Sequence, residues 1–162
     1  MKHLIATFLY VGHLRPAPGT WGSLAALPVA YVIYLYGGTL AVAVGALAAF
    51  GLGWWATIGE TAASDDHDPS HIVIDEVAGQ WIALLPVLIG IDRMGADPLA
   101  LYPGWIAAFV LFRLFDIWKP GPIGTADRRG DPLGVMLDDV IAGVFAAIGV
   151  VALAAFAHLV LM

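Results

Sequence analysis

The 162-residue sequence contains no cysteine, so it can form no disulfide, no thiolate metal site and no cysteine nucleophile. This excludes the phosphatases that attack through cysteine. Charged residues make up only 12% of the chain, against about 25% in a typical soluble domain. The net charge is −6, so the sequence also lacks the basic face that binding to a phosphate backbone requires. No nucleic-acid partner is expected.

Charge is missing altogether from two long stretches. Residues 16–59 contain no Asp, Glu, Lys, Arg or His, and the stretch from Val140 to the C-terminus contains only His158. Hydrophobic residues make up 60% of the chain, and the mean hydropathy is +0.86. A bilayer-spanning helix needs roughly 20 apolar residues. The composition therefore predicts a membrane protein, with a soluble all-helical core as the alternative.

The apolar runs are too long and too rich in Ala and Leu to be strands, so we expect about five helices. A Gly37-Gly38 turn and a polar tip at Asp92–Asp97 would join them into pairs. The predicted fold is all-α: one domain, residues 1–162, forming a multi-pass membrane bundle of two helical hairpins and a C-terminal helix. The expected helices are Leu24–Tyr36, Thr39–Ile58, Val77–Ile91, Pro98–Phe112 and Val140–Val160.

Three polar loops are expected on one side of this bundle, at Gly12–Ser23, Glu60–Glu76 and Asp116–Asp138. Six of the seven Lys and Arg residues lie on that side, and only Arg93 lies on the other. Cytoplasmic loops of membrane proteins collect Lys and Arg. We therefore expect the polar side to face the cytoplasm.

Two acidic pairs, Asp75-Glu76 and Asp138-Asp139, are each expected at the start of a helix. Acids there complement the helix dipole and cap free N–H groups, worth about 0.3–1 kcal/mol each. That explains either pair alone. Two pairs at one face, with Asp116 beside them, would repel one another unless a cation neutralises them. Mg²⁺ prefers such oxygen ligands, so the joint pattern favours a magnesium site.

Arg113, Asp116 and Lys119 recur every three residues and would share a helix face if the helix continues to Trp118. One interpretation is a surface salt-bridge ladder, which contributes little to stability. The other is that Arg113 and Lys119 bind a phosphate bridged to the metal. We favour the second, because the acidic pairs lie on the same side.

Two weaker signals flank these motifs. The Gly19–Ser23 turn begins an apolar helix, so Thr20 or Ser23 could cap that helix, or the turn could hold an anion. His67 and His71 have a metal-compatible spacing, but Pro69 between them argues against a helix. His71 could assist proton transfer, but we favour the interpretation that both are ordinary loop histidines.

Four blocks of this sequence resemble the signature blocks of the phosphatidylglycerophosphatase A family and occur in the same order. They span Gly12 to Gly143, most of the chain. One departure is Gly130-Asp131-Pro132 ahead of Gly134, where some relatives are richer in glycine, and it leaves the contribution of Asp131 open. The blocks are PAPGTWGS, IVIDEVAGQW, FRLFDIWKPGPI and DRRGDPLGVMLDDVIAG.

The resemblance implies an all-helical, magnesium-dependent phosphatase of the bacterial inner membrane that converts phosphatidylglycerophosphate into phosphatidylglycerol. The implied metal ligands are Asp75, Glu76, Asp116, Asp138 and Asp139. The expected catalytic residues are Arg113, Asp116, Lys119, Asp138 and Asp139. Phosphate binding is assigned to Thr20, Ser23, Arg113, Lys119, Asp127 and Arg128.

Two mechanisms remain open at this point: attack by metal-bound water, or a covalent aspartyl-phosphate on Asp116 or Asp138. A different function class, a small cation transporter or channel, would use the same acids along an ion path. It would place them mid-helix, near the bilayer centre. A non-catalytic lipid-binding scaffold would not need five acids beside the basic residues. The grouping at one membrane face favours an enzyme that acts on a lipid head group.

Overall fold

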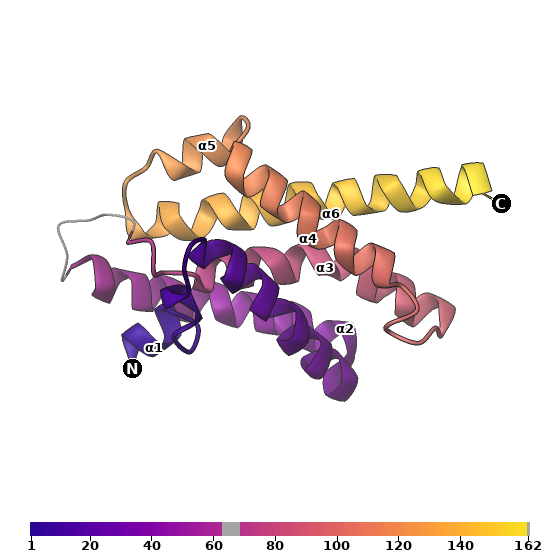
Figure 1. Cartoon of the computed structure of the whole chain (residues 1–162), viewed down its shortest axis with the longest axis horizontal. Coiled ribbons are helices and arrows are strands. Elements are labelled where there is room, and N and C mark those ends of the chain that lie inside the picture. The colour runs from indigo at the N-terminus through magenta and orange to yellow at the C-terminus, as the bar shows by residue number, and fades with distance from the viewer. Residues whose placement is uncertain (63–68, 162) are drawn as a thin grey trace.

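The structure is a computed structural model that describes residues 1–62 and 69–161, and within these ranges it is helical and contains no β-strand (Figure 1). This confirms the predicted all-α class. The elements are α1 (Lys2–Ala6), a short 3-10 turn η1 (Val11–His13), α2 (Pro18–Thr61), α3 (Ile74–Met94), α4 (Tyr102–Trp118), α5 (Pro122–Asp127) and α6 (Pro132–Leu161).

Helix α3 lies at the centre of the molecule and packs against α2, α4 and α6. Its core residues Leu84, Leu88 and Ile91 follow helical spacing and are almost completely buried. The outer helices instead expose large apolar side chains, such as Leu47 of α2 and Phe156 of α6. A helix that is apolar on every side belongs in a core or in a membrane. Helices α2, α3 and α6 are long and apolar enough to cross a membrane.

Helix α2 changes direction at Gly38, whose φ of 66° and ψ of −170° interrupt the helical backbone. Glycine adopts this conformation without a steric penalty. The two halves of α2 run back along each other, so both ends of the helix reach the same end of the molecule (Figure 1). The turn is fixed to α3, because the hydroxyls of Tyr34 and Thr39 each donate a 2.6 Å hydrogen bond to Asp92.

Several helices begin earlier than the sequence predicted. Helix α6 begins at Pro132 rather than Val140, and α3 begins at Ile74 rather than Val77. The expected loop from Asp116 to Asp138 is wrong, because it contains α5 and the first two turns of α6. Proline is favoured in the first turn of a helix, and such starts are poorly visible in a hydropathy pattern. The short helices α1 and α5 were not predicted.

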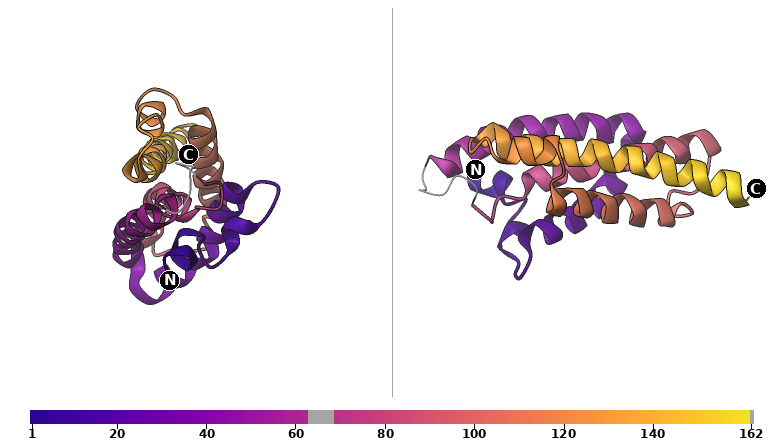
Figure 2. Two further views of the ribbon diagram at one scale, coloured as in Figure 1. Left: turned by 90° about the vertical axis from the view of Figure 1, so that its left-hand side faces the viewer. Right: turned by 90° about the horizontal axis from the view of Figure 1, so that it is seen from above.

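The polar segments meet at one end of the molecule. This end holds both ends of α2, the start of α3, the end of α4, helix α5 and the start of α6 (Figures 1 and 2). The C-terminus lies at the opposite end. Segments that are more than 100 residues apart in the sequence are therefore neighbours at this polar end.

Candidate active site

Helices α3 and α6 cross in direct backbone contact at Gly79 and Gly143. A β-carbon added at Gly143 would collide with the carbonyl oxygen of Gly79 and lie 3.0 Å from its Cα. Asp75 comes four residues before Gly79, and Asp139 comes four residues before Gly143. Residues four apart lie on the same helix face. The crossing therefore brings the two acidic pairs together one turn nearer the polar end.

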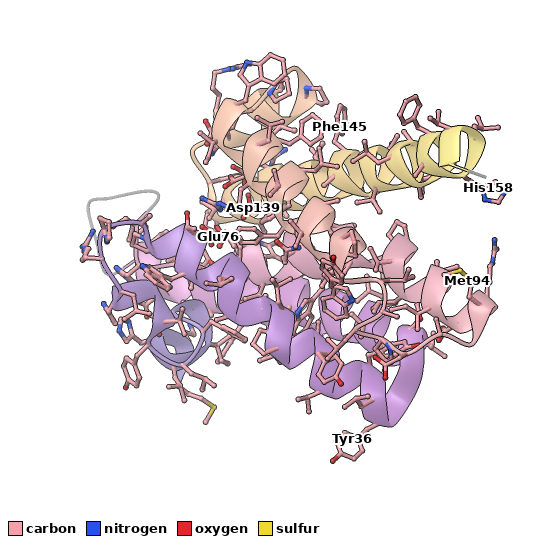
Figure 3. The ribbon with its side chains drawn as sticks, turned by 45° about the vertical axis from the view of Figure 1, so that its right-hand side comes forward. Tyr36, Glu76, Met94, Asp139, Phe145 and His158 are labelled. Atoms are coloured by element: carbon pink, nitrogen blue, oxygen red, sulfur yellow. The ribbon has the colours of Figure 1, made fainter. Side chains whose placement is uncertain are left out.

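The carboxylates form two overlapping groups whose ligand atoms lie within 4.8 Å of one another. One group is Asp75, Glu76 and Asp139, and the other is Asp116, Asp138 and Asp139, so Asp139 belongs to both. Asp139 is only 3% exposed and Asp75 only 7%. Figure 3 shows Glu76 and Asp139 close together between their helices. These acids come from three helices, α3, α4 and α6, and the fold brings their charges together in one small volume.

Arg113 reaches this cluster from α4. Its Nη1 atom lies 2.6 Å from Asp116 Oδ2 and 4.0 Å from Glu76 Oε1, and it donates a 3.3 Å hydrogen bond to the hydroxyl of Ser23. Arg113 and Asp116 thus share a face of α4, as their spacing predicted. The positive charge of the Arg113 guanidinium is therefore held among the carboxylates by contacts with α2, α3 and α4.

Lys119 does not continue that row. It follows the last residue of α4 with a left-handed backbone, φ 48°, and so lies outside the helix that carries Arg113 and Asp116. Its Nζ donates to Asp138 Oδ2 over 2.7 Å and also to Asp127. Burial lowers the pKa of Lys119, but the hydrogen bonds to Asp127 and Asp138 outweigh it, and the pKa lies above its ordinary value. Lys119 therefore stays protonated.

These side chains enclose a cavity of about 290 Å³. Its wall also includes Ser70 and the first residues of α2, among them Gly19. A β-carbon at Gly19 would collide with Glu76 Oε1, so glycine lets the N-terminus of α2 approach the carboxylates. The charged residues that line the cavity are Asp75, Glu76, Arg113, Asp116, Lys119, Asp138 and Asp139.

Two polar atoms of the site are buried without a hydrogen-bond partner among the described residues, Glu76 Oε2 and Arg113 Nε. An unpaired buried polar group costs about 1–3 kcal/mol. The first is an acceptor that suits a cation, and the second is a donor that suits an anion. The residues present therefore fit a divalent metal ion with a bound phosphate.

The predicted phosphate-binding residues of α2 have different surroundings. Ser23 is buried inside the helix, where its hydroxyl donates to the Gly19 carbonyl over 2.8 Å and accepts from Arg113. It does not cap α2, because the N-cap position is Ala17 and no side chain bonds there. Thr20 is half-buried and is not among the residues that line the cavity.

The predicted phosphate-binding residues of α5 lie farther out. Asp127 is exposed and reaches the site only through its hydrogen bond with Lys119. Arg128 is exposed and donates a 3.4 Å hydrogen bond to Thr125. Neither lines the cavity.

The capping interpretation of the acidic pairs is wrong for α6, since Asp138 and Asp139 are the seventh and eighth residues of that helix. The cap is Asp131, whose Oδ1 accepts a 2.7 Å hydrogen bond from the Gly134 N–H while its other oxygen pairs with Arg129. This answers the question that the sequence left open about Asp131. At α3 the N-cap residue makes no side-chain cap bond.

Sequence reasoning missed the residues that shape the site rather than line it with charge. Gly79 and Gly143 could have been found, because each follows an acid by four residues. Gln80 is completely buried, and neither of its amide atoms has a partner among the described residues. His67 lies outside the described residues. His71 lies outside the cavity, in a cluster with His3 and Glu60.

Comparison with known proteins points to one family. The sequence profile of the family described as phosphatidylglycerophosphatase A matches residues 4–154. A phosphatidylglycerophosphatase A from Haemophilus influenzae is 36% identical, covering 93% of this chain and 87% of its own. The protein of the same name from Escherichia coli is 36% identical, covering 90% and 78%.

A third relative, from Bacteroides thetaiotaomicron, is 38% identical over 90% of this chain and 88% of its own length, and it carries the provisional name phosphatidylinositol-3-phosphatase. No solved structure matches. The profile covers the segments that carry every charged residue lining the cavity. The chain belongs to the phosphatidylglycerophosphatase A family.

Proposed function

We propose that this protein is a magnesium-dependent lipid phosphatase that hydrolyses the phosphomonoester of phosphatidylglycerophosphate to phosphatidylglycerol and phosphate. One observation carries the proposal: five carboxylates and two cations line a single cavity at the polar end of helices long enough to cross a membrane. The names of the first two relatives support this substrate. Family membership gives no support to a cation transporter.

Arg113 and Lys119 are the groups that bind the substrate phosphate. Arg113 has an unpaired buried Nε donor, and a guanidinium can bind two phosphate oxygens at once. Lys119 stays charged between Asp127 and Asp138. Both positive charges are fixed in place before substrate arrives, so they oppose the charge that develops on the phosphoryl oxygens at no cost in reorganisation.

The carboxylates are the groups that would hold magnesium. Asp75, Glu76 and Asp139 provide one set of oxygen ligands, and Asp116 and Asp138 complete a second set that shares Asp139. Bound there, Mg²⁺ would neutralise phosphate charge and lower the pKa of a bound water. In hydrolysis the water oxygen bonds to phosphorus while the ester P–O bond breaks, and the departing glycerol oxygen takes up a proton.

The test is phosphate release by the purified protein in detergent micelles. We expect turnover of phosphatidylglycerophosphate that requires Mg²⁺ and stops with EDTA, and much lower kcat/KM for glycerol 3-phosphate. Phosphatidylinositol 3-phosphate serves as the second lipid, because of the third relative's name. Equal kcat/KM for lipid and soluble esters would contradict a lipid head-group site, and faster turnover of the inositol lipid would reassign the substrate.

We also propose that the chain is a multi-pass protein of a bacterial inner membrane with the cavity at the cytoplasmic face. Six of the seven Lys and Arg residues lie in segments at the polar end, which supports this orientation. The chain lacks cysteine, so single cysteines can be labelled without background. We expect Gly121→Cys to react only from the cytoplasmic side and Ala96→Cys only from outside. Labelling of Gly121→Cys from outside would reverse the orientation.

A further inference from the structure

A second cluster of metal-ligating side chains lies at the polar end, outside the active-site cavity. It joins His3 of α1, Glu60 near the end of α2, and His71 just before α3. Glu60 Oε2 lies 2.8 Å from His3 Nδ1 and 3.2 Å from His71 Nε2. One atom from each residue lies within 4.8 Å of the other two. None of the three residues lines the active-site cavity.

The surroundings of His3 follow the pattern of a metal-bound histidine. Its Nδ1 faces Glu60, and its Nε2 lies 3.0 Å from His13 Nε2. A ligating histidine usually gives its second ring N–H to a partner, which fixes the ring and its tautomer. With a metal on Nδ1, the Nε2–H of His3 donates to His13. His3 would then be the metal ligand, and His13 would be the residue that fixes the orientation of its ring.

The ring positions also match. Zinc–nitrogen bonds of about 2.0–2.1 Å at a near-tetrahedral angle place two ligating imidazole rings roughly 5 Å apart. The ring centroids of His3 and His71 are 5.3 Å apart. The side chains of His3, His71 and Glu60 are 41%, 29% and 17% exposed, so an ion can enter from solvent and keep a water ligand.

We propose that His3, Glu60 and His71 bind one zinc ion, with His13 as the hydrogen-bonded partner of His3. Two imidazoles and one carboxylate are a zinc ligand set, whereas Mg²⁺ selects oxygen ligands alone. The two metal sites of the chain therefore differ in donor chemistry. Zinc here would connect α1 to α2 and to the segment before α3. That segment contributes Ser70 and Ile72 to the cavity wall. It is already joined to α1, because the Val73 N–H donates a hydrogen bond to the Ala6 carbonyl.

The proposal is tested by metal content rather than by turnover. Untagged full-length protein, stripped with chelator, is dialysed against zinc in a large excess of Mg²⁺, and bound zinc is measured by elemental mass spectrometry. We expect about one zinc per chain in the wild type and in Asp139→Asn. His3→Ala, His71→Ala and Glu60→Gln should each lose it. Glu60→Gln keeps an oxygen acceptor for both histidines, so it loses the anionic ligand without losing the hydrogen bonds.

His13→Ala should retain the site with a Kd about 10- to 100-fold weaker, the effect of removing an outer-shell partner. His158→Ala is the matched control, a histidine near the opposite end of the molecule, and should leave zinc binding unchanged (Figure 3). Two results would overturn the proposal: no zinc on the wild-type protein, or zinc that only Asp139→Asn removes. The measurement needs no substrate, so its failure is distinct from failure of the proposed phosphatase activity.

Discussion

Asp75-Glu76 and Asp138-Asp139 look equivalent in the sequence but occupy different places in their helices. Asp75 and Glu76 lie in the first turn of α3, where negative charge is stabilised by the helix dipole. Asp138 and Asp139 lie two turns inside α6, where a helix has no free N–H groups to satisfy. Only the first pair has a local reason to be where it is.

The difference shows that the buried acids inside α6 are the ones that need a functional explanation. Asp139 is 3% exposed and stands among other carboxylates, and no helix end compensates it. Charges inside a membrane protein are costly and mark functional sites by default. Asp139 is also the one acid shared by both carboxylate groups. We therefore expect α6 to be more sensitive to charge removal than α3.

The largest effect is expected for Asp139→Asn. The amide keeps the shape of the side chain but removes an anionic ligand shared by both groups. Turnover should fall by at least about 100-fold, the scale of losing one preorganised electrostatic group. Thermal unfolding without Mg²⁺ should be no easier, because repulsion among the carboxylates is relieved. Phosphate release and the Tm in detergent provide the two readouts. Near-normal turnover would falsify the carboxylate–metal assignment.

Gly143→Ala tests the crossing that brings the two pairs together. The added methyl group would collide with the Gly79 backbone and separate α3 from α6. Overpacking of this kind costs about 1–3 kcal/mol of folding free energy, so we expect a lower Tm. We also expect turnover to fall by up to about 100-fold, because shifting the two acidic pairs apart by about 1 Å misplaces the groups of the site. Gly51→Ala is the control, since nothing lies within 4 Å of its added β-carbon. Equal turnover and equal Tm in the two variants would mean that the contact between α3 and α6 does not determine the geometry of the site.

Arg113→Lys separates phosphate binding from metal binding. The charge is kept, but the forked guanidinium that contacts Asp116 and Ser23 is lost. We expect kcat/KM to fall about 10-fold, as one charge-assisted hydrogen bond is lost. The Mg²⁺ concentration for half-maximal activity should stay the same. A matching increase in that concentration would instead place Arg113 in the organisation of the metal ligands.

The smallest effect on turnover is expected for Asp131→Ala, which removes the acid that does begin α6. Hydrogen bonds from Arg129 and from the Gly134 N–H lower the pKa of Asp131 below its ordinary value of 3.8. A carboxyl group whose pKa is lowered by folding stabilises the fold at pH values above its unfolded-state pKa. This stabilisation is lost as the pH falls through the folded-state pKa. The variant should therefore have a slightly lower Tm at pH 7, and the difference from wild type should shrink below about pH 4. Turnover should change little, and a loss as large as that of Asp139→Asn would erase the contrast between the two kinds of acid.

Much of the fold class and of the charged site could be predicted from the sequence. Long uncharged runs require helices in a membrane, because an unpaired backbone is too costly in lipid. Lone acids and cations are rare in such a chain, so the few that occur at its polar segments stand out. That reasoning named every charged residue that lines the cavity. Helix boundaries were less accurate, because Pro132 and the polar residues before it looked like a loop.

Tertiary structure alone decided which residues became neighbours. Two of these contacts join segments that are distant in the sequence: Gly79 with Gly143, and His3 with Glu60 and His71. A third depends on a change of chain direction at the end of α4, which lets Lys119 bind Asp127 and Asp138. Composition and spacing describe each segment in isolation. Helix pairing depends on which small residues allow two backbones to approach, and that is a property of two surfaces together.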